Sequence, residues 1–434
     1  MRSILKSKSI LLIFSVALFI RLFFAFTGND IPTGDEIFYE EAGRNISLGN
    51  GYLQAGHLTA SKTPGYPIFV GLIYRMFGKS LIPIRILQAL IDALMCVLVY
   101  MIAIRFFDRR VAFLSGVLCA FHYFFLKSLQ VIRPDTVQMF FIVLSILFWI
   151  RWRTNFFKKD AFFLGAALSF TVMLKANMIL LPFLIIAIEG YNFIKDKKIK
   201  FKIFSRSVLL LVFIFSLPLI AWSIRNYNAF NSFVPVATDG GLALYSSYNP
   251  PEGKKFGILT SDSVTTLAYR MDSEVERSKY LSKKTVEHIV NHPKEVLALM
   301  PLKILFFWSV FDWETLGDEN GVYNFATGFI LPFSFLGMFF LRKRFKEIYP
   351  IIWPIVYAFS LAIIFAGIPR FRMAVEPFLI IFSAYAMTFF YDRYSKRMVA
   401  LFILSWFFFN FYMFTDSSCI FLIGKSTLRC LKLW

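Results

Sequence analysis

Long apolar stretches alternate with short polar segments along most of the chain. Eleven of these stretches approach the roughly 20 residues that a helix needs to cross a hydrocarbon core of about 30 Å. The pattern therefore predicts an all-α polytopic membrane protein with about eleven transmembrane helices. The predicted spans are residues 10–27, 81–106, 110–127, 134–152, 160–176, 177–194, 207–224, 322–341, 348–367, 374–391 and 398–415.

Basic residues cluster in the short segments between the apolar stretches. With a cytoplasmic N-terminus, every cluster falls on the cytoplasmic side, as the positive-inside rule expects. Counting residues 296–311 as a further crossing would place the basic run 342–346 outside, so this segment suits a helix lying along the membrane surface. We therefore expect a multi-pass protein of the plasma membrane. The clusters are Arg2 to Lys8, Arg105 to Arg110, Arg151 to Lys159, Lys195 to Arg206, Arg342 to Lys346 and Arg393 to Arg397.

The composition excludes a soluble protein. Of 434 residues, 58% are hydrophobic and only 17% are charged. A formal net charge of +20 would suggest nucleic acid in a soluble protein. Here the positive charge lies in the membrane-flanking clusters, and we expect no nucleic-acid partner. The four cysteines show no metal-ligand spacing, and we expect no required disulfide.

Two long polar segments interrupt the apolar pattern. They span residues 28–80 and 225–321, and the alternation places both on the extracytoplasmic face. Long loops on one face commonly carry the functional site of a membrane protein. We expect a single integral membrane domain over 1–434, with an acidic helix in the first loop and an interfacial helix in the second. Residues 322–434 would then hold the C-terminal spans and a short tail, without a large soluble domain.

The first loop opens with an acidic helix. The sequence from Gly34 to Tyr52 predicts a short helix that ends near Gly49 and carries Asp35 and Glu36 at its start. Asp35 and Tyr39 share one face of this helix. If that face packs against the protein, the Asp35 carboxylate lies in a cleft. The alternative is that Asp35 only favours the positive end of the helix, as acids at this position commonly do.

Basic side chains on the same face of the membrane point to an anion. Lys62 precedes Pro64 and Pro67, and it is either a lysine reaching toward the interface or a point charge for a phosphate. Arg225, Arg370 and Arg372 lie outside against the positive-inside trend. Because the planar guanidinium matches phosphate oxygens in pairs, these arginines favour a bound anion.

A second acid lies at the outer end of the span 134–152. Asp135 follows Arg133 and Pro134, where an acid favours a helix N-terminus. A carboxylate that shares the cavity of Asp35 would also serve acid-base chemistry or substrate orientation. The sequence carries no glycine-rich phosphate loop, no G-x-S-x-G and no H-E-x-x-H motif.

Five motifs occur together in one family. They are D-E-x-x-Y-x-x-A at Asp35, K-x-P-G-Y-P at Lys62, R-P-D at Arg133, the run from Trp222 to Gly241 and P-R-F-R…E-P at Pro369. In this order they resemble the GT-C glycosyltransferases of the dolichyl-phosphate-mannose protein mannosyltransferase type, including the bacterial aminoarabinose transferases that modify lipid A. The resemblance extends from the first span to about residue 391.

The resemblance implies a role for each candidate residue. Asp35, with Glu36 beside it, would activate the acceptor hydroxyl, and Asp135 would be the second acid of the cavity. Lys62 would contact the donor phosphate, with Arg225, Arg370 and Arg372 near the same group. Tyr39 is the expected contact for the sugar or the acceptor. No cofactor is expected, although a divalent metal at Asp35 and Asp135 is an alternative.

The expected function is transfer of a sugar from a polyprenyl phosphate, dolichyl or undecaprenyl, to an acceptor hydroxyl with inversion at the anomeric carbon. The expected partners are this donor, a lipid, glycan or protein acceptor, and membrane lipids. A transporter or flippase of a lipid-linked sugar is the alternative, because it too needs a phosphate-binding cavity and many spans. A membrane scaffold would explain the spans but not the acids.

Overall fold

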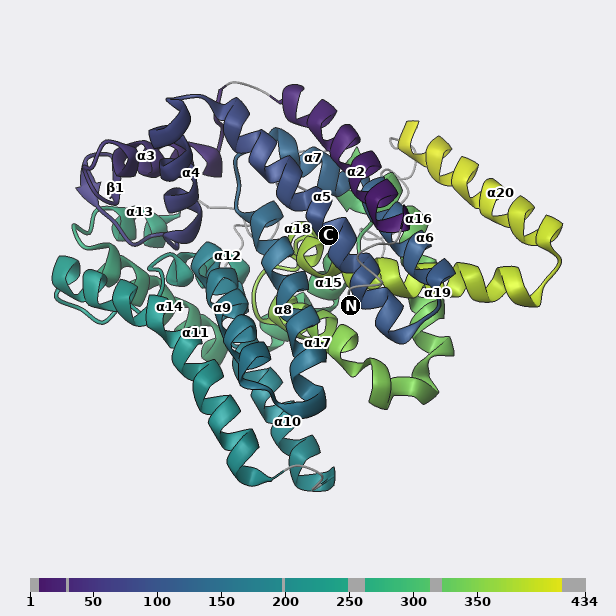
Figure 1. Cartoon of the computed structure of the whole chain (residues 1–434). Helices are drawn as coiled ribbons and strands as arrows, with labels where there is room; N and C mark the ends of the chain where they lie inside the picture. The colour runs from purple at the N-terminus through teal and green to yellow at the C-terminus, as the bar shows by residue number, and fades with distance from the viewer. Residues whose placement is uncertain (1–7, 29–30, 197–199, 249–261, 313–321, 416–434) are drawn as a thin grey trace. The chain divides into compact units, whose positions relative to one another are not determined.

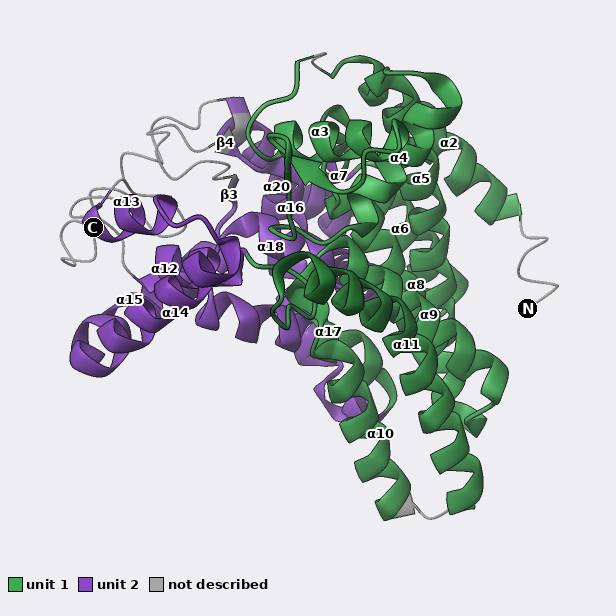
Figure 2. Ribbon diagram, turned by 90° about the vertical axis from the view of Figure 1, so that its left-hand side faces the viewer, with its two compact units in different colours: residues 1–121, 125–238, 347–354 green, residues 122–124, 239–346, 355–434 purple. Residues whose placement is uncertain are grey.

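The computed structural model describes residues 8–28, 31–196, 200–248, 262–312 and 322–415 (Figure 1). The chain forms two compact units, shown in different colours in Figure 2. The first unit comprises residues 1–121, 125–238 and 347–354, and the second comprises 122–124, 239–346 and 355–434.

The first unit is built on long apolar helices. Helix α5 packs against α2, α6 and α8, and α9 packs between α8 and α11. The first long loop adds a two-stranded hairpin and the helices α3 and α4. The elements are α2 (Lys8–Phe26), α3 (Asp35–Ser47), β1 (Leu53–Gln54), β2 (His57–Leu58), α4 (Gly65–Phe77), α5 (Leu81–Phe106), α6 (Arg109–Ala120), α7 (Tyr123–Lys127, which begins in the second unit), η1 (Ser128–Gln130), α8 (Asp135–Asn155), α9 (Lys158–Leu174), η2 (Ala176–Met178), α10 (Leu181–Asp196) and α11 (Phe201–Phe230).

The second unit is also mainly helical. Helix α16 packs against α19 at Gly337, where a Cβ atom would lie 2.1 Å from the carbonyl oxygen of Phe382. Only glycine allows this close approach of two helices. The elements are α12 (Gly240–Tyr248), α13 (Ser263–Tyr269), α14 (Glu274–Asn291), α15 (Pro293–Phe307), β3 (Phe311–Asp312), β4 (Val322–Tyr323), α16 (Phe325–Phe340), η3 (Arg342–Arg344), α17 (Phe345–Ile364, partly in the first unit), α18 (Pro369–Arg372), η4 (Met373–Val375), α19 (Glu376–Arg393) and α20 (Lys396–Thr415).

The chain is a multi-pass membrane protein. Among the described residues, seven helical segments are long and apolar enough to cross a membrane, and the bent pair α6 and α7–η1 makes an eighth if it forms one span. Helices α9, α16 and α20 also lie in predicted spans but fall outside these eight. The 16 residues of α16 extend only about 24 Å, which is short for the hydrocarbon core. The count of eleven spans therefore stays a prediction.

Buried charges join three of the helices in the first unit. The Arg21 Nε atom on α2 lies 2.6 Å from Asp92 Oδ2 on α5, and both side chains are fully buried. The same guanidinium donates to the carbonyl oxygens of Ala120 and Cys119, at 2.9 and 3.2 Å. These carbonyls end helix α6, so Arg21 supplies donors that lipid could not. Ionisable residues within spans pair in this way because isolated charges are costly there.

Helix α11 is longer than the sequence pattern predicts. The span expected over 207–224 extends as a helix from Phe201 to Phe230, and Asn231 ends it in the left-handed conformation, with φ of 47°. Arg225 therefore lies on a helix rather than at the start of a loop. The segment after the helix folds back on it, because Trp222 Nε1 donates to the Val236 carbonyl at 2.7 Å.

Candidate functional site

Helices α3 and α4 form a tightly packed platform in the first long loop. A Cβ atom at Gly43 would lie 2.4 Å from Val70 Cγ1, and one at Gly71 would lie 2.9 Å from the Gly43 carbonyl oxygen. The two glycines therefore permit backbone contact between the helices. The acidic helix predicted from Gly34 to Gly49 is present as α3, and its first residue is Asp35.

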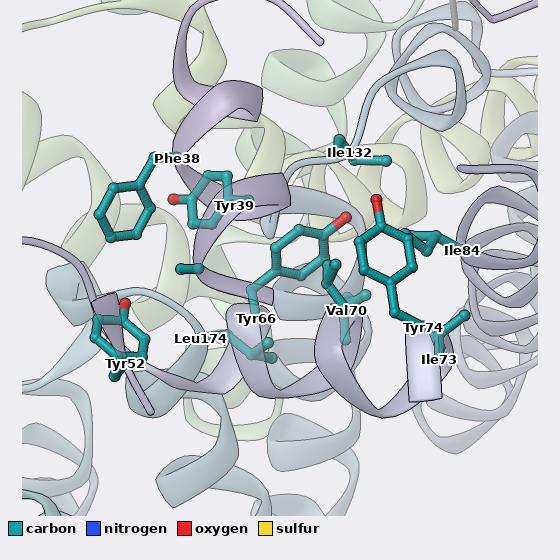
Figure 3. Close-up of a cluster of buried hydrophobic side chains, with 12 residues drawn as sticks. Phe38, Tyr39, Tyr52, Tyr66, Val70, Ile73, Tyr74, Ile84, Ile132 and Leu174 are labelled. Carbon is teal, nitrogen blue, oxygen red and sulfur yellow. The ribbon is translucent and has the colours of Figure 1, made fainter. Parts of the chain in front are cut away.

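An aromatic cluster anchors this platform (Figure 3). The Tyr39 and Tyr66 rings meet edge to face with their centroids 5.1 Å apart. Tyr66 is fully buried and donates its hydroxyl to Gln88 Oε1 on α5. Burial raises the pKa of Tyr66 well above its ordinary value, and the neighbouring Glu36 and Asp135 carboxylates raise it further. Both acids therefore act on the same buried tyrosine.

The structure brings together three of the predicted site residues, Asp35, Lys62 and Tyr39. The Lys62 ammonium donates to Asp35 Oδ1 and lies 5.0 Å from the centroid of the Tyr39 ring. The lysine side chain is 22% exposed and the aspartate side chain 40%. The N-cap residue of α3 is Gly34, which has no side chain to cap the helix. Asp35 is the first residue of the helix, and its carboxylate pairs with Lys62.

A second acid, Asp135, pairs with a lysine that the sequence analysis did not select. Lys175 Nζ lies 2.9 Å from Asp135 Oδ1, and the aspartate side chain is only 9% exposed. Gln138 Nε2 donates to the Lys175 carbonyl at 3.1 Å and to Asn177 Oδ1 at 2.7 Å, which fixes the main chain between α9 and η2. The signal in the sequence was a lone lysine near the end of the predicted span 160–176.

The third acid, Glu36, is the most deeply buried of the three. Its Oε1 atom lies 3.9 Å from Arg133 Nε, and its side chain is 5% exposed. The R-P-D motif thus supplies Arg133 beside Glu36 and Asp135 beside Lys175. A basic side chain accompanies each of the three predicted catalytic acids in this unit.

Glycine in the K-x-P-G-Y-P motif lets α4 approach the end of α9. A Cβ atom at Gly65 would lie 2.5 Å from the carbonyl oxygen of Met173, two residues before Lys175. The motif therefore begins with Lys62, which pairs with Asp35. Its later residues form the first turn of α4, which packs against the end of α9 near Lys175.

Arg225 holds the first loop through its main chain. Its guanidinium donates to the carbonyl oxygens of Thr59 and Tyr52, at 2.7 and 3.1 Å, and lies 4.8 Å from the centroid of the Trp222 ring. The Thr238 amide adds a bond to the Ala60 carbonyl at 2.9 Å. The end of α11 and the segment after it therefore hydrogen-bond to the main chain on both sides of the β1–β2 hairpin. Contact of Arg225 with a phosphate stays a prediction.

Arg370 and Arg372 belong to the second unit. Arg372 is buried, its Nε atom lies 3.0 Å from Glu376 Oε1, and it donates to the carbonyl oxygens of Phe307 and Ser309. Arg370 is partly exposed on the same short helix. The predicted phosphate contacts of these two arginines stay predictions, and Arg370 has the more accessible side chain.

The described residues do not fit the metal alternative. Within them, no group of three or more His, Cys, Asp or Glu side chains is placed to hold a metal ion. Asp35 and Asp135 each lie against a lysine ammonium, whereas divalent cations such as Mg²⁺ and Ca²⁺ favour several oxygen ligands. We therefore assign no step of the chemistry to a metal.

Sequence comparison finds a family match over a part of the chain that includes Lys62 and Asp135. Residues 61–222 match the model of the family described as dolichyl-phosphate-mannose-protein mannosyltransferase. An uncharacterized protein from Aquifex aeolicus (strain VF5) is 27% identical over 139 residues, which cover 31% of this chain and 28% of that protein.

Solved structures extend the similarity to most of the chain. The oligosaccharyltransferase of Archaeoglobus fulgidus in its apo form has a TM-score of 0.59 at 13% identity, covering 95% of this chain and 56% of that one. The same enzyme with an inhibitory peptide and a dolichol-phosphate gives 0.59 at 12%, covering 94% and 55%. ArnT from Cupriavidus metallidurans bound to undecaprenyl phosphate gives 0.44 at 14%, covering 87% and 76%.

The family model and the shared fold confirm the resemblance to the GT-C membrane glycosyltransferases. The chain spans little more than half the length of the oligosaccharyltransferase that it matches. At this level of identity, the structural similarity concerns the fold of the molecule.

Proposed function

We propose that this protein is a membrane glycosyltransferase that moves a sugar from a polyprenyl phosphate to an acceptor hydroxyl. The observation that carries the proposal is the Lys62–Asp35 pair above Tyr39, which places a phosphate-binding cation beside a carboxylate base. The mannosyltransferase family match over residues 61–222 supports the same chemistry. A solved protein of the same fold holds dolichol-phosphate, which supports a polyprenyl phosphate as the donor class.

Each residue of the site then has a chemical role. Asp35 accepts the proton of the acceptor hydroxyl as its oxygen attacks the anomeric carbon. The bond from that carbon to the phosphate oxygen breaks, and the electron pair leaves with the lipid phosphate. Lys62 stabilises the charge that grows on this phosphate. Attack from the face opposite the leaving group inverts the anomeric carbon.

The other acids and the arginines complete the proposed site. Glu36 and Asp135, close to the buried Tyr66, orient the sugar or the acceptor, and Tyr39 lines the position of the sugar. Of the two arginines in the P-R-F-R motif, Arg370 is the partly exposed one, and we propose it as a further cation for the lipid phosphate. Arg225 and Arg372 each contact backbone carbonyls within their own unit.

The proposed location is the plasma membrane, with the N-terminus in the cytoplasm and the site on the extracytoplasmic face. The basic clusters between the spans support this orientation. The donor is a hexosyl or pentosyl polyprenyl phosphate, and the acceptor is a lipid, a glycan or a protein.

A transporter of lipid-linked sugars is the less favoured candidate. It would use the cations but would have no need for a carboxylate paired with the phosphate-binding lysine. The two candidates also differ in their response to Asp35→Asn. This change should abolish transfer by removing the base, whereas transport should survive it.

The test is sugar transfer from a panel of radiolabelled polyprenyl-phosphate sugars to membrane extract acceptors. Purified wild type would be compared with Asp35→Asn and with Glu40→Gln, each with and without a chelator. Glu40 is the matched control because it lies on the same helix and pairs with Lys79 at 3.4 Å. Turnover that fails only in Asp35→Asn supports the proposal. No turnover with any donor, alongside lipid translocation by both variants, would replace it with transport.

A further inference from the structure

We infer that Lys62 is an exchangeable partner of Asp35, which masks the base until a polyprenyl phosphate arrives and then moves to that phosphate. This inference rests on the proposed function and concerns how the same site is regulated. Binding of the donor phosphate would free the Asp35 carboxylate. The acceptor hydroxyl would then lose its proton only when the donor is in place.

The geometry allows the lysine end to move while its main chain stays fixed. The Tyr52 hydroxyl donates to the carbonyl oxygens of Lys62 and Thr63, at 2.9 and 3.3 Å. The ammonium lies at the other end of a flexible four-carbon side chain, over the rings of Phe38 and Tyr39. The head group can therefore turn between two anions without any change in the loop backbone.

The exposure of the pair permits the exchange. Both side chains are partly exposed, at 22% for Lys62 and 40% for Asp35. Ion pairs in contact with solvent contribute little net free energy, so breaking this one costs little. A lipid phosphate offers several strong acceptor oxygens and at least one negative charge, and its charge-assisted bonds to an ammonium compete well with one carboxylate.

Two other lysine–carboxylate pairs of the first unit lack this combination. Asp135 is only 9% exposed, so separating it from Lys175 would leave a charge buried. Glu40, which pairs with Lys79, is 17% exposed, against 40% for Asp35. The exchange is therefore specific to the pair at the start of α3.

A zero-length cross-link reports the pair directly. A water-soluble carbodiimide activates the Asp35 carboxyl, and the Lys62 amine attacks it to form an amide, while the oxygen leaves in the urea. Peptide mass spectrometry would quantify this amide in the full-length wild-type protein in detergent. The Glu40–Lys79 amide, formed in the same loop, is the internal control. Lys62→Arg should remove only the first cross-link, because a guanidinium does not form the amide.

Farnesyl phosphate, a short polyprenyl phosphate, is the probe. We expect it to lower the Asp35–Lys62 cross-link at least fivefold and to leave the Glu40–Lys79 cross-link within twofold. Farnesol should have no effect, because it lacks the anion. If inorganic phosphate alone lowers the cross-link equally, the site selects the anion without the lipid, which would overturn the polyprenyl part of the inference.

Two results would overturn the exchange itself. One is an Asp35–Lys62 cross-link that persists at the solubility limit of farnesyl phosphate, and the other is its absence in the resting protein while the control cross-link forms. Donor turnover measured on the same preparation separates the two proposals. Turnover with a persistent cross-link would refute the exchange and keep the transferase. A cross-link that falls without turnover of any donor would keep the exchange and refute the transferase.

Discussion

Two lysine–aspartate pairs in the first unit have the same chemistry but different surroundings. Lys62 and Asp35 meet at the start of α3 with a substantial part of each side chain exposed. Lys175 and Asp135 meet at the start of α8, where the carboxylate is almost entirely buried and Gln138 fixes the main chain of the lysine. The main chain of Lys62 is also held, by the Tyr52 hydroxyl, so burial of the carboxylate rather than residue type distinguishes the two pairs.

The difference in burial between the two aspartates suits the two pairs to different roles. A pair that opens at little cost is suited to binding a charged substrate and releasing a base. A pair with a buried carboxylate resists opening, because that charge left alone in a low dielectric is costly. In the proposed mechanism the Asp35–Lys62 pair opens at the donor phosphate, while the closed Asp135–Lys175 pair keeps the Asp135 carboxylate in place beside Tyr66.

Replacing the base should give the largest effect. We expect Asp35→Asn to lower kcat for sugar transfer by roughly 10²- to 10⁴-fold, the contribution that a general base commonly makes. Single-turnover transfer from a polyprenyl-phosphate sugar measures it. Glu40→Gln on the same helix should stay within about twofold. Equal losses in the two variants would show that the change acts through the fold of α3 and not through a base.

Removing Lys175, the partner of the buried carboxylate, should chiefly lower stability. Lys175→Met leaves the Asp135 carboxylate buried without its cation, so we expect a loss of about 3 kcal/mol in the free energy of unfolding, as for other broken buried pairs. Unfolding in an SDS titration measures it. Lys79→Met, which removes a lysine that is 61% exposed, should cost less than about 0.5 kcal/mol.

A double variant sharpens the same prediction. Asp135→Asn combined with Lys175→Met removes both charges and should recover part of the lost stability, because the two sites are directly coupled. Strictly additive losses would contradict a direct interaction between these side chains.

The helical architecture could be predicted from the sequence because hydrophobic periodicity is a local signal. Every apolar stretch contains a helix, and the acidic helix in the first loop is present as α3. The positions of Asp35 and Tyr39 on one face of that helix also follow from periodicity. Their contact with Lys62 could also be predicted, because the resemblance assigned all three residues to one site.

The partners of the other charges could not be predicted in this way. Lys175 lies 40 residues from Asp135, so the pair exists only once α8 and α9 have packed together. Arg225 binds backbone carbonyls, and such contacts leave no pattern of residue types in the sequence. For Arg21 and Asp92 there was a signal, because a lone charge in a predicted span usually has a partner within the bundle.

Neutralising Lys62, the partner of the more exposed carboxylate, should affect donor binding more than stability. We expect Lys62→Gln to weaken binding of a polyprenyl phosphate by about 10- to 100-fold, since a hydrogen bond to a charged group contributes about 1.5–3 kcal/mol. Its unfolding should change by less than about 1 kcal/mol, in contrast to Lys175→Met. Titration with farnesyl phosphate, followed by tryptophan fluorescence, measures the affinity. A stability loss equal to that of Lys175→Met would remove the distinction between the two pairs.

The smallest effect tests why the buried pair stays closed. Gln138→Ala removes the amide that holds the Lys175 carbonyl and Asn177 Oδ1, and we expect a loss of about 1 kcal/mol in the free energy of unfolding. The freed main chain should also increase the exposure of Lys175 above its present 23%. Acetylation of accessible lysines followed by mass spectrometry would detect this as faster labelling. Labelling of Lys62 should not change. Unchanged labelling of Lys175 would mean that burial alone keeps the Asp135 pair closed, without help from its anchored backbone.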